Sequence, residues 1–124
     1  MRASIRIGLC VAGLGIVLGG CVSTSARREN PAELKARSEQ AVAACRAQPL
    51  TTFVARAQCL NDAALIAAPV SPNPDLLQRA LAARLDIAGR VDRKEITPEA
   101  GAKEYGRIEA QLAAEGQKRL ADGE

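Results

Sequence analysis

The side chains with the most chemistry to offer in this 124-residue sequence are four cysteines, Cys10, Cys21, Cys45 and Cys59. The chain has no histidine, which excludes His-based catalytic triads, His metal ligands and His pH switches. It also lacks the glycine-rich phosphate loops, the nucleophile elbow and the calcium-loop pattern of common enzyme and cofactor sites. We therefore expect a protein that is not an enzyme and that holds neither a cofactor nor a metal.

The segment before Cys21 has the pattern of an export signal. Arg2 and Arg6 make its start basic, and residues 7–18 form the uncharged apolar run IGLCVAGLGIVL. A basic start, a short apolar stretch and small residues before a cleavage point are typical of a secretory signal peptide. The run is shorter than the ~20 apolar residues that a transmembrane helix needs. An ordinary cleaved signal without lipid, or an uncleaved anchor, is the alternative interpretation.

The residues Leu18, Gly19, Gly20 and Cys21 resemble the lipobox of bacterial lipoproteins, in which an aliphatic and two small residues precede a cysteine. The resemblance implies that a diacylglycerol is attached to the Cys21 sulfur, that a dedicated signal peptidase cuts before it, and that the new amine is acylated, for example with palmitate. Three acyl chains make a secure anchor, since two are already enough. In that class an aspartate after the lipidated cysteine retains the protein in the inner membrane. Val22 stands there instead, which implies the outer membrane, facing the periplasm.

The expected organisation is a signal peptide (residues 1–20), a lipid-anchored tether (21–30) and a helical domain (31–121). Residues 22–30 are polar, and fully extended they span at most ~30 Å. The mature chain would have 104 residues, with 15 basic against 14 acidic side chains. With so few aromatic residues and no basic stripe, nothing indicates nucleic-acid binding. The expected partners are the membrane, through the acyl chains on Cys21, and an envelope protein or a second copy of the chain.

Cys45 and Cys59 remain once the leader and the lipidated cysteine are set aside. An even pair in an exported chain predicts one disulfide. It closes a loop of about 15 residues, for which the chain-entropy model gives a stabilisation of ~3 kcal/mol. Counted from the link between the two expected helices, Cys45 and Cys59 lie at positions along the helix axes that differ by roughly 6 Å. For the sulfurs to meet, either the helices cross steeply or the link itself runs along the axis before the second helix begins. A redox-active or metal-binding pair is the alternative, although no CxxC motif or other soft ligand accompanies it.

Apolar residues recur every three or four positions along residues 31–121, and no segment alternates with period two. The start and stop signals are Asn30-Pro31 and Pro49 for a first helix, Thr51 or Thr52 and Pro69 for a second, Asp75 for a third, and Thr97-Pro98-Glu99 for the last. Residues 69–74 contain three prolines and predict an ordered turn or a short extended link. Short links favour antiparallel neighbours, so we expect an all-α fold: three to four helices in an antiparallel bundle or a pair of hairpins, after the lipidated tether.

The apolar stripes of these helices predict the core. They are Leu34, Ser38, Ala41 and Cys45; Phe53, Ala57, Leu60, Ala64 and Ala68; Leu77, Leu81, Ala88 and either Leu85 or Arg84; and Tyr105, Ile108 and Leu112. In the mature chain only 20 of 104 residues are Leu, Ile, Val or Phe, while 23 are Ala, so the core is thin. A partner or a second copy could complete it. Alternatively the Ala content, together with 13 Arg against 4 Lys, reflects the base composition of the genome.

The turn before the last helix carries a second resemblance. Residues 92–95, Asp-Arg-Lys-Glu, form a mixed charge run, for which a solvated helix face is expected. Together with Cys45 and Cys59, residues 92–100 (DRKEITPEA) resemble small uncharacterised alphaproteobacterial lipoproteins that have a two-Cys helical hairpin and a D-x-G-x-I-T-x-x-E-A turn into a last helix. Lys94 stands where that turn has Gly, and the Glu-Ala pair comes one position early. The resemblance implies a class of protein and no activity.

Two function classes follow. The first is a non-catalytic lipid-anchored envelope protein that acts as a protein-binding, scaffold or modulator module, with Tyr105, Ile108 and Leu112 as its interface. The second is a peptidoglycan- or small-ligand-binding periplasmic lipoprotein, although sugar sites usually need more aromatic residues than this chain has. A pocket lined by Tyr105 and converging charges would favour the ligand, whereas a flat Ala-rich apolar face would favour a partner protein.

Overall fold

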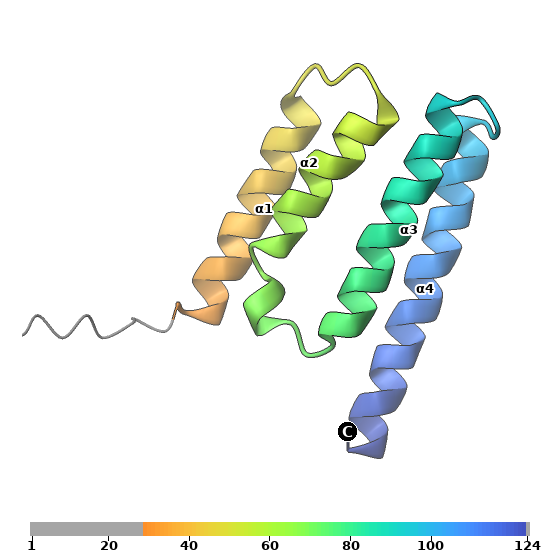
Figure 1. Cartoon of the computed structure of the whole chain (residues 1–124). Helices are drawn as coiled ribbons and strands as arrows, with labels where there is room; N and C mark the ends of the chain where they lie inside the picture. Colours follow the sequence, from red (N-terminus) through yellow and green to blue (C-terminus); the bar gives the residue numbers. More distant parts are fainter. Residues whose placement is uncertain (1–28, 124) are drawn as a thin grey trace, which may run out of the picture.

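The computed structural model describes residues 29–123, which form four α-helices and one 3-10 turn (Figure 1). The elements are α1 (Pro31–Ala47), α2 (Phe53–Leu65), η1 (Ala68–Val70), α3 (Pro74–Asp92) and α4 (Pro98–Asp122). These residues contain no strand, and the predicted all-α class is confirmed. The expected leader, Cys21 and most of the expected tether lie outside the described residues.

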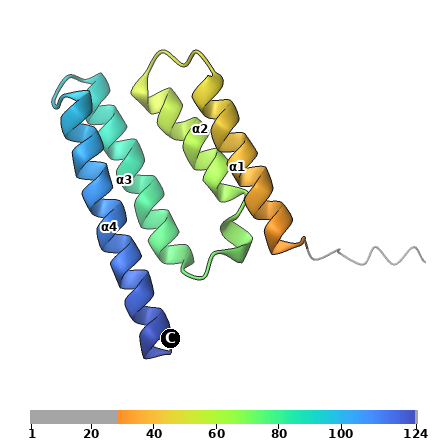
Figure 2. The ribbon, with the colours of Figure 1, turned by 180° about the vertical axis from the view of Figure 1, so that it is seen from behind.

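The helices stand side by side in chain order, and successive helices run in opposite directions (Figures 1 and 2). The main helix–helix contacts in the described chain are α1 on α2, α2 on α3, and α3 on α4. One end, which we call the tether end, holds the start of α1, η1 and the end of α4 (Figure 1). The opposite end, the loop end, holds the links 48–52 and 93–97 (Figure 1). The fold is therefore an open pair of antiparallel hairpins.

Local signals place the helix ends. The side chains of Asn30, Thr52 and Thr97 each accept a hydrogen bond from a backbone N–H in the first turn of α1, α2 and α4 respectively. These bonds satisfy donors that have no partner inside the helix. The third helix begins at Pro74, with Asp75 in its first turn, as the sequence predicts. The proline-rich link contains η1, so it is an ordered turn.

Asp92, the last residue of α3, caps the start of α2. Its carboxylate accepts hydrogen bonds from the backbone N–H groups of Phe53 and Val54, at 2.9 and 2.8 Å. Both groups lie at the positive end of the α2 dipole and have no partner within the helix. A solvated environment was the expectation for residues 92–95. All four residues are exposed, as predicted, and two of them form the Arg93–Glu95 ion pair (2.6 Å). The cap that Asp92 provides could not be predicted, because the ends of α2 and α3 meet only in the folded chain.

The turn from α3 into α4 contains a left-handed residue. Lys94 has a φ of 60° and is the one non-glycine residue with positive φ in the described chain. Its N–H donates to the carbonyl of Val91, and the N–H of Glu95 donates to the carbonyl of Arg90, both at 2.9 Å. This is the hydrogen-bond pattern of a Schellman helix C-cap, whose left-handed position glycine usually occupies. Lys94 thus takes the place that Gly holds in the turn it resembles.

The core is thin and consists of small and aliphatic side chains. Its buried members are Leu34, Cys45, Ala57, Ala63, Leu76, Leu81, Ile87, Ala88, Val91 and Leu112. Two residues of the expected stripes lie at the surface instead: Phe53 is 44 % exposed and Leu85 is 38 % exposed. Leu85 is exposed because its neighbour Arg84 points inward between the helices, where it contacts the polar side chains of Asn61 and Glu109.

A glycine and several ion pairs hold α3 against α4. A Cβ on Gly101 would lie only 3.0 Å from Cγ2 of Val91 and 3.1 Å from Cγ2 of Ile87, so the absent side chain permits the close approach. At the tether end, the Arg119 guanidinium donates two hydrogen bonds of 2.8 Å to the Asp75 carboxylate. These bonds hold the pKa of Asp75 below its ordinary value. Small residues therefore set the spacing of the second hairpin, and charged residues fix its register.

Candidate functional site

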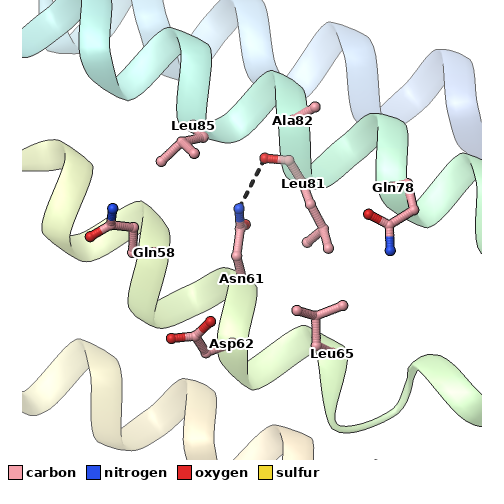
Figure 3. Close-up of a pocket in the computed structure, with 8 residues that line it drawn as sticks. All are labelled: Gln58, Asn61, Asp62, Leu65, Gln78, Leu81, Ala82 and Leu85. Atoms are coloured by element: carbon pink, nitrogen blue, oxygen red, sulfur yellow. Dashed lines mark hydrogen bonds between the residues drawn. The ribbon is translucent and has the colours of Figure 1, made fainter.

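Two depressions flank the contact between α2 and α3. The first has a volume of about 520 Å³ and is lined by those two helices alone (Figure 3). In Figure 3, Asn61 points from α2 toward α3, where its amide donates to the carbonyl of Leu81 at 3.0 Å. Leu65 and Leu85 are partly exposed beside it, and Asp62 is the single charged residue among those that line it. Its other polar side chains, Gln58, Asn61 and Gln78, are neutral, so this surface offers only one charge to a ligand.

The second depression, which we call the α2–α4 groove, lies toward the loop end and has a volume of about 400 Å³. Its floor is α3, which packs on both α2 and α4, and those two helices form its walls. The apolar lining residues are Phe53, Ala57, Leu60, Ile87, Ala88, Val91, Pro98, Gly101 and Ala102. The polar ones are Arg46, Arg56, Arg84, Tyr105 and Glu109. An apolar floor with few polar groups is the usual character of a binding site.

Arg84 joins three helices beneath this groove. From α3 its guanidinium donates to the side-chain carbonyl of Asn61 on α2 at 2.9 Å. The same group lies 4.9 Å from the ring centroid of Tyr105 and 3.8 Å from the carboxylate of Glu109, both on α4. A partly desolvated arginine over an aromatic face gains a cation–π attraction in addition to its hydrogen bonds. The groove therefore has a fixed floor.

Tyr105 is half-buried in the α4 wall. Its hydroxyl is buried and finds no hydrogen-bond partner in the described part of the chain. Burial raises the pKa of Tyr105 to about 12, against an opposing effect of the Arg84 charge. Because the Arg84 guanidinium covers one face of the ring, Tyr105 does not offer that face for stacking on a sugar.

The structure separates the residues that were expected to form an interface. Tyr105 lines the groove, whereas Leu112 is buried and belongs to the α3–α4 core. Ile108 is intermediate in exposure. The arginines of the groove carried no sequence signal of a site, apart from the position of Arg84 on an otherwise apolar stripe. Arg46 and Arg56 approach the groove only through the packing of α1 and α2.

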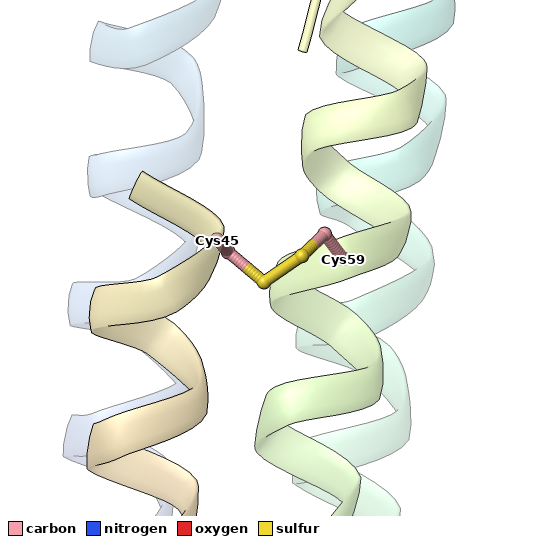
Figure 4. The surroundings of a disulfide bond; sticks show 2 residues. All are labelled: Cys45 and Cys59. Atoms are coloured by element: carbon pink, nitrogen blue, oxygen red, sulfur yellow. A yellow bond between two sulfur atoms is a disulfide. The ribbon is translucent and has the colours of Figure 1, made fainter. Parts of the chain in front are cut away.

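Cys45 and Cys59 form a disulfide between α1 and α2 (Figure 4). Their Cα atoms are 5.8 Å apart, within the range that a disulfide spans. Figure 4 shows the two helices running side by side, so the 48–52 link, rather than a steep crossing, takes up the expected difference in depth. One turn further along α2, the hydroxyl of Ser38 donates to the carbonyl of Ala63 at 2.8 Å. The predicted disulfide is confirmed, and it reinforces the α1–α2 contact.

Within residues 29–123, no group of three or more Cys, Asp and Glu side chains could hold a metal ion. None of the helices described has the length and hydropathy needed to cross a bilayer. Comparison with protein-family models, with characterised protein sequences and with solved structures finds no match to this chain.

Proposed function

We propose that this protein is a non-catalytic, lipid-anchored module of the bacterial envelope that binds another envelope protein through the α2–α4 groove. The observation that carries the proposal is the groove itself, an open apolar surface on three helices with Phe53 44 % exposed at one end. Exposed apolar surface rimmed by polar groups is typical of interaction sites. The thin core of the open hairpin pair agrees with a module whose apolar surface a partner completes.

The lipobox pattern of residues 18–21 supports membrane attachment through acyl chains on Cys21, and Val22 supports the outer membrane, facing the periplasm. The tether would join the domain at the start of α1, which belongs to the tether end. α1 has 17 residues and is therefore about 25 Å long. The groove lies toward the loop end. It would therefore face away from the membrane anchor, where a periplasmic partner can reach it.

A small anionic ligand is the second candidate, because one observation favours it. The groove is lined by Tyr105 and by converging charges, and its volume of about 400 Å³ falls within the range of small-molecule sites. The covered ring face and the buried hydroxyl of Tyr105 argue against a peptidoglycan sugar. We place the protein partner first because α2 and α4 leave one side of the groove open along their length.

A photoreactive amino acid at Ala102 tests the proposed function in living cells. Ala102 is exposed and lines the groove, whereas Ala82 is exposed and lines the α2–α3 pocket. The two are a matched pair of exposed alanines on adjacent helices. We expect a covalent adduct with another envelope protein from position 102 and none from position 82. Capture from position 82 alone, or from neither position, would exclude the groove as the protein-binding site.

Substitution of Cys21 by Ala tests the anchor. The wild-type chain should incorporate a fatty-acid probe and be processed, whereas Cys21→Ala should remain an unlabelled precursor. Cys10→Ala is the control, because Cys10 lies within the expected leader and its loss should leave both labelling and processing intact. A mature Cys21→Ala protein that still carries the probe would refute lipidation at this residue. Fractionation of the wild-type protein wholly into the inner membrane would refute the proposed location.

A further inference from the structure

Two unpaired arginines stand on the rim of the α2–α4 groove. Of the nine arginines in the described chain, six have a carboxylate oxygen within 4.0 Å. The other three described arginines, Arg46, Arg56 and Arg107, have no carboxylate oxygen within that distance. Arg46 and Arg56 line the groove. Arg84 and Glu109 also line it but pair with each other at 3.8 Å. The groove therefore carries two positive charges that no described side chain neutralises.

The disulfide joins the two helices that carry these arginines. Arg46 directly follows Cys45 in α1, and Arg56 lies three positions before Cys59 in α2. The Arg56 guanidinium is further held near the 48–52 link by a hydrogen bond of 3.4 Å to the carbonyl of Leu50. Both arginines thus line the groove on its α2 side, with exposed side chains. The α4 side contributes Pro98, Ala102 and the already paired Glu109.

The shape of the groove fits a helix. Both α2 and α4 pack on α3, and the groove between them is the position that a further helix would occupy on this bundle. Its floor runs along α3 from Arg84 to Val91, a distance of about 10 Å. Two turns of a helix cover that distance and present apolar residues at spacings of three, four and seven.

We infer that the α2–α4 groove binds an acidic amphipathic helix of a periplasmic partner, with the apolar face of that helix on α3 and its carboxylates toward Arg46 and Arg56. The inference rests on the proposed function and names the chemistry of the partner. A guanidinium can donate two parallel hydrogen bonds to one carboxylate. Two unpaired guanidinium groups on one wall therefore favour a helix with acidic residues along one edge. Among the described residues that line the groove, those from α4 include no cation, so the opposite edge of the bound helix needs no acidic residue.

A single-chain anionic amphiphile such as a fatty acid has the same two chemical features, but the groove suits it less well. Ligand sites of this kind bury most of the ligand, and the α2–α4 groove is open on the side away from α3. An acyl chain there would remain in contact with water along its length. A helix covers its own backbone polar groups and needs only one apolar face buried.

The test extends the Ala102 photocrosslink by sequencing the captured segment. We expect a segment with apolar residues at helical spacing and acidic residues along one edge. A synthetic peptide of that segment should become helical on binding to the purified full-length protein. The double variant Arg46→Glu/Arg56→Glu should weaken binding of the peptide about tenfold or more. Arg107→Glu, which reverses the third unpaired arginine outside the groove, should leave the dissociation constant within about twofold.

Each other outcome overturns the inference in a recognisable way. A captured segment that is basic or extended, or whose binding is unchanged in Arg46→Glu/Arg56→Glu, leaves a protein-binding groove but refutes the acidic helix. Capture of a second copy of this chain at position 102 assigns the groove to self-association. Recovery of lipid rather than protein from position 102, together with binding of laurate to the purified protein, assigns the groove to an amphiphile and removes the proposed function as well.

Discussion

At the scale of single residues, Lys94 and Tyr105 are held in states that their side chains do not favour. Lys94 occupies the left-handed position of the Schellman cap, where a Cβ comes too close to the following carbonyl oxygen. Tyr105 buries its hydroxyl without a partner in the described chain, although an unpaired buried polar group is costly. Lys94 lies in the 93–97 link at the loop end, and Tyr105 lines the groove.

Lys94→Gly should stabilise the protein by about 0.5–1 kcal/mol. Relief of the left-handed strain contributes about 1–2 kcal/mol, and the greater freedom of glycine in the unfolded chain offsets part of it. Urea unfolding of the purified protein measures the change. Lys103→Gly is the control, because Lys103 is an exposed residue inside α4, where glycine should destabilise by about 1 kcal/mol. Destabilisation by both substitutions would contradict the assigned turn.

The pKa of Tyr105 in the folded protein should lie well above that of a free tyrosine. Burial raises its pKa to about 12, against about 10 in the unfolded chain. The folded state therefore retains its proton while the unfolded state loses it, so the contribution of Tyr105 to stability should be constant below pH 10 and should be lost between about pH 10 and 12. Tyr105 is the one tyrosine in the sequence, so tyrosinate absorbance reports it alone. A midpoint near 10 in both native and urea-unfolded protein would mean that the ring is exposed.

At the scale of elements, the α3–α4 hairpin depends on the distance between its helices. Val91 and Ile87 are β-branched, so their side chains cannot easily rotate away from a new methyl group at position 101. Gly106 lies farther along the same helix, and a Cβ there would meet nothing within 4 Å. The two glycines thus have opposite roles, which a single type of substitution can separate.

Gly101→Ala should destabilise the protein by about 1–3 kcal/mol, because the added methyl group overpacks the α3–α4 contact. Gly106→Ala should stabilise it by about 0.5–1 kcal/mol, because alanine restricts the unfolded chain and favours the helix. Both values come from the same thermal or urea unfolding measurement. Equal stabilisation by the two variants would show that α3 and α4 lie farther apart than described.

At the scale of the whole molecule, the open arrangement gives α1 one main neighbour. α1 packs mainly on α2, and the Cys45–Cys59 disulfide adds a covalent link to that one contact. The second hairpin is independent of this link, since α3 and α4 are joined by their own core and ion pairs. Reduction should therefore act first on the first hairpin and on the arginine wall of the groove.

Cys59→Ser should lower the free energy of unfolding by ~3 kcal/mol, as expected for a loop of this length. Hydrogen exchange should show the largest loss of protection in α1 and a smaller loss in α3 and α4. Dithiothreitol should reproduce the effect in the wild-type protein and add nothing further in Cys59→Ser. A uniform loss of protection across all four helices would mean that the two hairpins unfold as one unit.

The helices and their ends follow from the sequence because they depend on residues three or four positions apart. Asn30, Thr52 and Thr97 cap backbone groups in their own first turns, so the sequence determines these helix starts. The disulfide was predictable for another reason: if residues 1–20 are an export signal and Cys21 carries lipid, as predicted, Cys45 and Cys59 are the two cysteines left. The anchor and the location remain predictions from residues 1–22.

The groove was decided only by the tertiary structure. Asp92 caps a helix whose start lies 39 positions earlier in the chain, and Arg84 reaches Asn61 across 23 positions. No pattern in adjacent residues encodes such contacts, because they depend on the directions in which α2 and α4 leave α3. Those directions decide whether the four helices close into a ring or remain an open pair of hairpins. They therefore also decide whether Arg46 and Arg56 are two solvated charges or one wall of a binding groove.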